Sequence, residues 1–312
     1  MDTLSSAFRE YIKQSIALSN APAIVTGENV FQEANNNILP YLDKVVEELI
    51  LPGSGLDGRE NLEDLYAKAE AGKSCLLLPE HYSNLDLCLF SYLVRKAGGR
   101  GEDIARSLIA IAGVKLNEDN PAVSAFASAY SRIVIYPSRS LQENKDNKAE
   151  IIRSNSINRA AMKTLNELKT QGRLVLVFPS GTRFRPWDPS SKKGVREVDS
   201  YIKSFDYMCL VAINGVVLHV HQGDMIEDTV GKDVVCISAG PVLSCTEFRA
   251  RVRAEMDATD RRIAERRSED RKTPDRRLED KKEKKQAVAD AIMAELEKMH
   301  IEGEIKRKQF LQ

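Results

Sequence analysis

The sequence has no paired cysteine motif and no excess of charge of either sign. Its five cysteines form no C-x-x-C pair, which excludes the common zinc-ribbon and dithiol redox motifs. Their odd number fits a reducing compartment. The 46 basic residues are balanced by 46 acidic ones, so nothing in the composition supports nucleic-acid binding as the main activity. His219 and His221 have no evident third ligand, so we expect no metal site.

Long apolar segments are also missing. Residues 1–14 lack the apolar core of a signal peptide, and no stretch approaches the roughly 18 uncharged apolar residues of a membrane span. We therefore expect a cytoplasmic protein. Peripheral contact with a membrane surface is compatible with that location.

Three short apolar runs that each stop at a proline are the clearest elements. They cover residues 74–79, 133–137 and 174–179. Continuous apolar runs of this length are typical of strands that are buried on both faces, as in a parallel sheet. Helical stretches over 84–97 and 147–170 separate them. This alternation predicts an α/β fold with a mostly parallel central sheet flanked by helices.

The remaining elements complete this picture. Two more strands are expected over 208–214 and 233–239. Residues 1–50 look helical, and a Gly/Pro/Asp loop over 51–59 precedes a further helix over 61–71.

We divide the chain into an N-terminal helical region (1–60), an α/β domain (61–246) and a charged C-terminal helical extension (247–312). Charges of both signs dominate residues 260–285, which is typical of a solvated helix or segment. Apolar residues at helical spacing over 287–299 then predict a final helix that packs back on the core.

Polar residues gather where three of the predicted strands end. His81, Arg139 and Arg183 each follow a strand by a few residues. Ligands of open α/β sheets bind beyond the carboxyl ends of the strands. We therefore expect a histidine and several arginines to converge on one rim of the sheet.

His81 and Asp86 are the residues best placed for acid–base chemistry. A helix is expected to begin near Ser83 or Asn84, which puts Asp86 in its first turn. From there the carboxylate can reach the imidazole, fix its tautomer and leave the other nitrogen free to take a proton from a hydroxyl. A capping aspartate beside an ordinary surface histidine is the alternative interpretation. Cys88 is expected to point to another side of the helix.

A second polar group lies in the segment 178–185, Phe-Pro-Ser-Gly-Thr-Arg-Phe-Arg. Backbone N–H groups of a turn through Ser180, Gly181 and Thr182 could form an anion-binding nest. Arg183 and Arg185 carry guanidinium groups suited to phosphate oxygens. With Arg139 they predict a site for a phosphate-bearing ligand. The alternative is a tight turn whose arginines pair with surface acids.

Together these motifs resemble the glycerolipid acyltransferase superfamily. The histidine–aspartate box H-x-x-x-x-D is followed, in the expected order, by Pro-x-Gly-x-Arg. Residues 179–186, Pro-Ser-Gly-Thr-Arg-Phe-Arg-Pro, are most similar to the soluble, plastid-type glycerol-3-phosphate acyltransferases. The chain departs from that type at Ser140, where the plastid enzymes have a histidine, and at Leu210, where the superfamily usually has a proline.

The resemblance implies a set of roles. His81 corresponds to the catalytic base and Asp86 to its partner, while Arg183, Arg185 and Arg139 correspond to residues that hold the substrate phosphate. The expected reaction moves a fatty acyl group from acyl-CoA or acyl-carrier-protein to the sn-1 hydroxyl of glycerol 3-phosphate. No bound cofactor is implied.

Three other interpretations remain. The acceptor could be lysophosphatidic acid. The chain could be a non-catalytic lipid-binding protein that keeps the fold. It could also be a dinucleotide-binding oxidoreductase, because residues 53–58 fit G-x-G-x-x-G and Glu80 lies where a ribose-binding acid would be expected. That fingerprint needs a strand before Gly53, whereas residues 42–50 predict a helix.

Overall fold

The structure is a computed structural model that describes residues 1–118, 120–144, 146–223, 227–264 and 274–311. Part of the charged segment 260–285 lies outside these residues, and the side chains of 259–280 are not described either. The described ends of that segment are helical.

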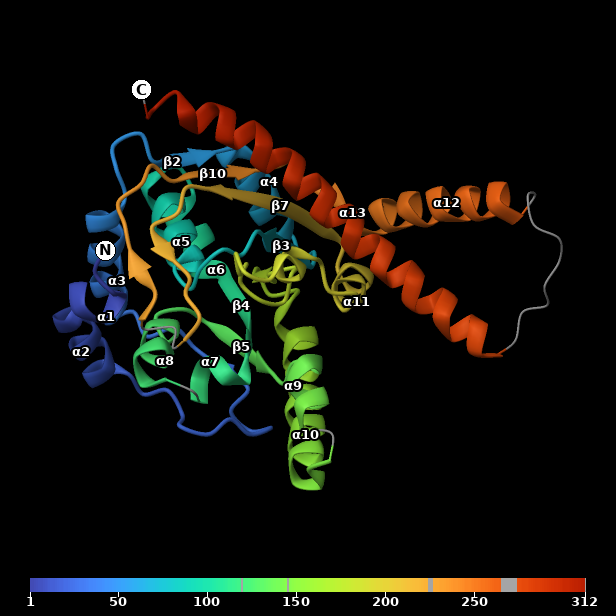
Figure 1. Cartoon of the computed structure of the whole chain (residues 1–312), viewed down its shortest axis with the longest axis horizontal. Coiled ribbons are helices and arrows are strands. Elements are labelled where there is room, and N and C mark those ends of the chain that lie inside the picture. Colours follow the sequence, from blue (N-terminus) through green and yellow to red (C-terminus); the bar gives the residue numbers. More distant parts are fainter. Residues whose placement is uncertain (119, 145, 224–226, 265–273, 312) are drawn as a thin grey trace.

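A mixed sheet of nine strands forms the centre of the described chain (Figure 1). Five neighbouring strands run parallel, and the strands at both sides of this group are antiparallel to it. The predicted α/β fold with a mostly parallel sheet is confirmed. In spatial order the strands are β1 (Phe31–Gln32), β5 (Arg132–Ile135), β4 (Leu108–Gly113), β6 (Leu174–Leu176), β3 (Cys75–Pro79), β7 (Tyr207–Asn214), β10 (Cys236–Ala239) and β2 (Gly55–Asp57), with β11 (Leu243–Ser244) paired to β7.

Helices cover both faces of the sheet, because successive strand residues point to opposite sides. Cys75 and Leu77 of β3 join one buried cluster, and Leu76 and Leu78 join the other. The first cluster is covered by α1 (Leu4–Ala7), α2 (Arg9–Leu18), α3 (Leu39–Leu49), α4 (Arg59–Glu70), α5 (Asp86–Lys96), α6 (Gly101–Ser107) and α8 (Pro121–Ala127). The second is covered by α7 (Val114–Glu118), α9 (Ser138–Glu143), α10 (Lys148–Leu168), α11 (Val198–Ser204), α12 (Cys245–Ala264) and α13 (Pro274–Lys308).

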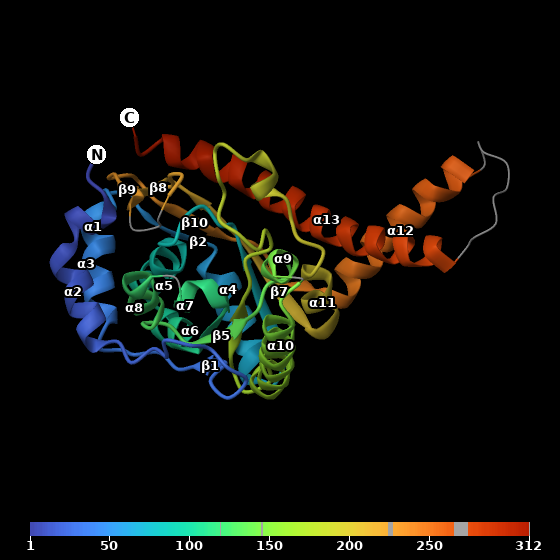
Figure 2. The same ribbon diagram turned by 60° about the horizontal axis from the view of Figure 1, so that its bottom comes forward.

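The C-terminal helix α13 lies along the sheet, next to β7 and β10 (Figures 1 and 2). Val288, Ile292 and Leu296 are fully buried in the second cluster. Near its end, Arg307 donates to both carboxylate oxygens of Asp233 at 2.5 and 2.6 Å. No helix among the described residues is both long enough and apolar enough to cross a membrane.

Several expectations for individual elements were wrong. Strand β4 was not predicted, and its sequence Leu-Ile-Ala-Ile-Ala-Gly is rich in small residues with low strand propensity. The loop expected over 51–59 contains the edge strand β2. Residues 19–38 include no helix, and the short strand β1 lies there instead. A smaller two-stranded sheet, β8 (Leu218–His219) with β9 (Thr229–Val230), was also missed.

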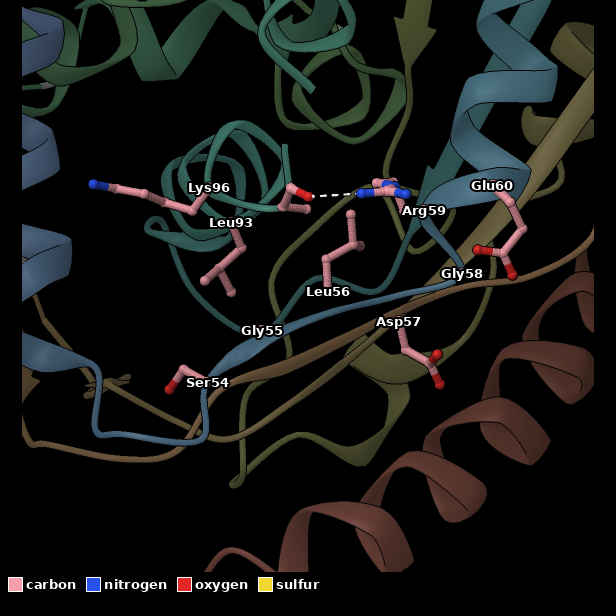
Figure 3. A pocket seen from close by; sticks show the side chains of 10 residues that line it. Ser54, Gly55, Leu56, Asp57, Gly58, Arg59, Glu60, Leu93 and Lys96 are labelled. Atoms are coloured by element: carbon pink, nitrogen blue, oxygen red, sulfur yellow. Dashed lines mark hydrogen bonds between the residues drawn. The ribbon is translucent and has the colours of Figure 1, made fainter. Parts of the chain in front are cut away.

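The glycine-rich segment 53–58 does not have the setting of a dinucleotide fingerprint. Helix α3, not a strand, precedes Gly53. Gly58 has a φ of 76°, and a Cβ there would come within 2.1 Å of the carbonyl oxygen of Ala239, so close packing accounts for this glycine. The segment lines a hollow of about 350 Å³ beside α5 (Figure 3). None of the predicted site residues lines this hollow.

Candidate active site

His81 and Asp86 meet at the carboxyl end of strand β3. Oδ2 of Asp86 lies 2.9 Å from Nδ1 of His81. The same oxygen accepts the backbone N–H groups of Tyr82 and Ser83 at 2.6 and 2.9 Å, and Oδ1 accepts the Ser83 hydroxyl at 2.8 Å. Asp86 is only 2% exposed. This set of donors suits a carboxylate, so Nδ1 of His81 carries the proton and Nε2 is left as the basic nitrogen.

The imidazole of His81 is fixed on its other sides as well. Its ring stacks on Phe178 with the centroids 3.8 Å apart, and its backbone carbonyl accepts the N–H of Phe184 at 2.8 Å. The side chain keeps 16% of its surface exposed. No hydrogen bond from a described residue reaches Nε2. The ring is therefore held in one orientation, with Nδ1 engaged by Asp86.

Phe178 was not predicted as a site residue. Leu77 of β3 is paired with Leu176 of β6, so the register places Phe178 opposite Pro79, two residues before His81. Parallel pairing of the two apolar runs that end in proline would have placed Phe178 at the strand end that carries His81.

Helix α5 begins later than expected. Its first residue is Asp86, and Leu85 occupies the N-cap position without a side-chain bond to the helix. Neither Ser83 nor Asn84 caps the helix; Ser83 instead donates its hydroxyl to Asp86. The carboxylate therefore folds back over the preceding residues, which places it against the imidazole.

Arg183 is held by an acid that the sequence did not reveal. Its guanidinium forms an ion pair with Asp228, which is 0% exposed. The second oxygen of Asp228 accepts the backbone N–H of His221 at 2.9 Å. Because Asp228 neutralises it, Arg183 contributes less positive charge to a phosphate than its position in the motif suggests. Nothing local marks Asp228, which is separated from Arg183 by 45 positions.

Arg139 and Arg185 share a different neighbour. Arg139 is exposed at the start of α9, and Arg185 is partly buried after the glycine turn. The pKa of Asp188 lies below its usual value, chiefly because the Ser190 hydroxyl donates to it and also because Arg139 and Arg185 are nearby cations. Both guanidinium groups therefore lie close enough to the Asp188 carboxylate to favour its charged form.

The turn after β6 offers only part of the predicted anion nest. Gly181 has a φ of 65°, which a glycine adopts without strain. Its N–H is donated to the carbonyl of Phe178 at 2.9 Å, and the N–H of Arg185 is donated to Ser191 at 2.8 Å. The hydroxyl of the buried Ser180 donates to the carbonyl of Thr182 at 2.6 Å. These groups are used within the protein and stabilise the turn.

Glu80, one residue before His81, is a further buried acid at this rim. It is 3% exposed. Oε2 accepts the backbone N–H of Ile213 at 2.9 Å and lies 2.8 Å from Nδ1 of His300, and Oε1 accepts the Tyr82 hydroxyl at 2.9 Å. His300 comes from α13, 220 positions away in the sequence.

Cys88 is unsuited to nucleophilic catalysis. It is buried in the first cluster, and burial raises the pKa of its thiol to about 12. A thiol of this kind is protonated at neutral pH. Cys75 and Cys209 are buried as well, whereas Cys236 is partly exposed. Among the described residues, no group of three histidine, cysteine or acidic side chains could hold a metal ion.

Comparisons with known proteins identify the family of this chain. One solved structure with a similar arrangement is the 1-acyl-sn-glycerophosphate (LPA) acyltransferase PlsC from Thermotoga maritima. It has 15% sequence identity and a TM-score of 0.37, and the match covers 85% of this chain and 91% of that one. No curated protein matches the sequence. The profile of the Acyltransferase family matches residues 56–222, more than half of the chain, and the chain therefore belongs to the Acyltransferase family.

Proposed function

We propose that the protein transfers a fatty acyl group from acyl-CoA or acyl-carrier-protein to the sn-1 hydroxyl of glycerol 3-phosphate. The observation that carries this proposal is the His81–Asp86 pair, in which Nδ1 of His81 lies 2.9 Å from the Asp86 carboxylate and the imidazole is stacked on Phe178. Membership of the Acyltransferase family supports the reaction type.

In the proposed mechanism His81 acts as a general base. Nε2 takes the proton of the acceptor hydroxyl while the oxygen attacks the thioester carbonyl carbon. Asp86 stabilises the resulting imidazolium through the Nδ1 proton. The tetrahedral intermediate then expels the thiolate, which takes the proton from Nε2 and leaves as a thiol. Two bound substrates that are aligned in this way need no acyl-enzyme.

The phosphate of the acceptor would bind between Arg139 and Arg185. Both can donate several N–H groups to phosphate oxygens. Asp188 shares this region and would be displaced or bridged when the phosphate binds. In this arrangement Arg183 mainly supports the turn, because Asp228 already pairs with it.

Lysophosphatidic acid is the second candidate acceptor, since it carries the same phosphate and a free hydroxyl. The Pro-Ser-Gly sequence of the turn favours glycerol 3-phosphate by resemblance. An acceptor with one acyl chain would also need an apolar path beside His81. The two acceptors therefore differ in what the site must accommodate in addition to the phosphate.

The test is a product assay with purified protein and labelled acceptors. Protein would be incubated with palmitoyl-CoA or palmitoyl-carrier-protein and either glycerol 3-phosphate, lysophosphatidic acid or glycerol, and the lipids would be separated. We expect monoacylated phosphate from glycerol 3-phosphate and little product from glycerol. Product from lysophosphatidic acid alone would support acyl transfer by the proposed mechanism but make lysophosphatidic acid the acceptor. No product from any acceptor would contradict the proposed function.

A further inference from the structure

The C-terminal helix reaches the residues on both sides of His81. Nδ1 of His300 lies 2.8 Å from the carboxylate of Glu80 and 3.3 Å from the hydroxyl of Tyr82. Tyr82 also donates its hydroxyl to Glu80 at 2.9 Å. The residue before His81 and the residue after it therefore meet at one side chain of α13. We call Glu80, Tyr82 and His300 the clamp.

The clamp is tied to the catalytic pair through the backbone. The N–H of Tyr82 donates to Oδ2 of Asp86, the oxygen that also holds His81. The N–H of Glu80 donates to Val211 of β7 at 3.0 Å. A shift of Glu80 or Tyr82 would move the short segment that carries His81 relative to Asp86. Catalytic geometry is sensitive to such shifts, since about 1 Å of displacement can cost roughly 100-fold in rate.

We propose that His300 is a positioning residue for His81, so that α13 is a working part of the active site. His300 supplies a hydrogen-bonding partner for the buried Glu80 carboxylate and fixes that carboxylate between β3 and β7. It does not touch substrate in this account. The proposal builds on the proposed function for its kinetic readout only.

Two other attachments of α13 argue that the clamp does more than hold this helix on the sheet. Leu296 and other buried apolar residues already dock α13 on the sheet. Arg307 gives a second, separate ionic attachment to Asp233. Docking of α13 therefore does not depend on the clamp. Within the clamp, His300 contacts the two residues that flank the proposed base. A buried carboxylate without a partner is strongly destabilising, so Glu80 needs a specific partner at this place.

The experiment compares variants in the full chain. His300→Leu removes the hydrogen bond to Glu80, and His300→Gln keeps a donor at similar length. Arg307→Gln is the matched control, because it weakens the docking of the same helix without touching the clamp. Each protein would be examined by hydrogen–deuterium exchange of the amides of Tyr82 and Ile213 and by steady-state kinetics. If His300→Leu does not fold, the double variant Glu80→Gln/His300→Leu takes its place in the comparison. The second substitution removes the buried carboxylate that His300→Leu would leave without its partner.

We expect His300→Leu to speed exchange at Tyr82 and Ile213 and to lower kcat by roughly 10- to 100-fold with KM within about twofold. His300→Gln should recover part of the rate, and Arg307→Gln should leave both readouts unchanged. Normal exchange and normal kcat in His300→Leu would overturn the proposal. An equal loss of kcat in Arg307→Gln would do so too, because docking alone would then explain it. If the wild type acylates no acceptor, the proposed function fails, while the exchange comparison still decides whether the clamp holds the segment.

Discussion

Oδ2 of Asp86 lies 2.9 Å from Nδ1 of His81 and accepts two backbone N–H groups as well. The carboxylate thus orients the imidazole and also stabilises the turn before α5. An amide at this position would lack the negative charge that balances the N–H donors gathered around Oδ2. Both the tautomer of the histidine and the local backbone depend on the negative charge.

Asp86→Asn should therefore lower kcat by roughly 100- to 10,000-fold, because the imidazolium loses its stabilising partner. KM for the acceptor should change little, since Asp86 does not contact the phosphate region. Steady-state kinetics would give both values. A variant with wild-type kcat would show that the pair is a structural cap without a catalytic role.

Arg139→Ala and Arg185→Ala should raise KM for glycerol 3-phosphate. A hydrogen bond to a charged group contributes about 1.5–3 kcal/mol, which corresponds to roughly 10- to 100-fold in affinity. The exposed Arg196, on the same loop, provides the control as Arg196→Ala. Kinetics with varied acceptor would separate KM from kcat. An increase of the same size in the control would point to a general loss of positive field and not to a binding site.

Arg183→Ala should act mainly on stability. It leaves the fully buried carboxylate of Asp228 without its partner, and breaking a buried pair costs about 3–5 kcal/mol. The double variant Arg183→Ala/Asp228→Asn should recover part of this loss. Urea unfolding followed by circular dichroism would measure it. An unchanged unfolding midpoint together with a large rise in KM would instead make Arg183 a substrate ligand.

The clamp should give the protein a pH-dependent component of stability. The pKa of His300 is raised, first by its hydrogen bond to Glu80, and Glu297 adds to the rise while burial and Lys192 oppose it. A raised pKa means that this stabilisation is complete below the unfolded value of about 6.5 and is lost as pH rises through the folded value. Tyr82 faces the same group as a neutral hydroxyl.

The difference in unfolding free energy between wild type and His300→Gln should therefore be largest in mildly acidic solution and shrink as pH rises. Urea denaturation at a series of pH values would follow it. A difference that grew with pH would have the wrong sign for a protonated His300 and would contradict this assignment.

Features that are local in the sequence were predicted well. The strands β3, β5 and β7 are continuous apolar runs, and their burial on both faces follows from that composition. The His81–Asp86 pair was accessible because only a few residues separate its members. The strand β4 was missed because alanines and a glycine replace the branched residues that mark a strand.

Features that depend on distant segments could not be predicted in the same way. Asp228 and His300 come from separate parts of the chain, and each becomes significant only when the fold buries it against a specific partner. An acid in a loop and a histidine in a charged helix are ordinary in isolation. Their roles arise from burial, which removes water and makes an unpaired charge costly.

In the proposed mechanism, Nε2 of His81 removes the acceptor proton. A single-turnover assay with labelled palmitoyl-CoA and saturating glycerol 3-phosphate would compare wild type with His81→Ala, after circular dichroism has shown that both are folded. We expect acyl transfer by the wild type and a rate reduced by at least roughly 100-fold in the variant. Equal rates in the two proteins would contradict it and would place the catalytic base elsewhere.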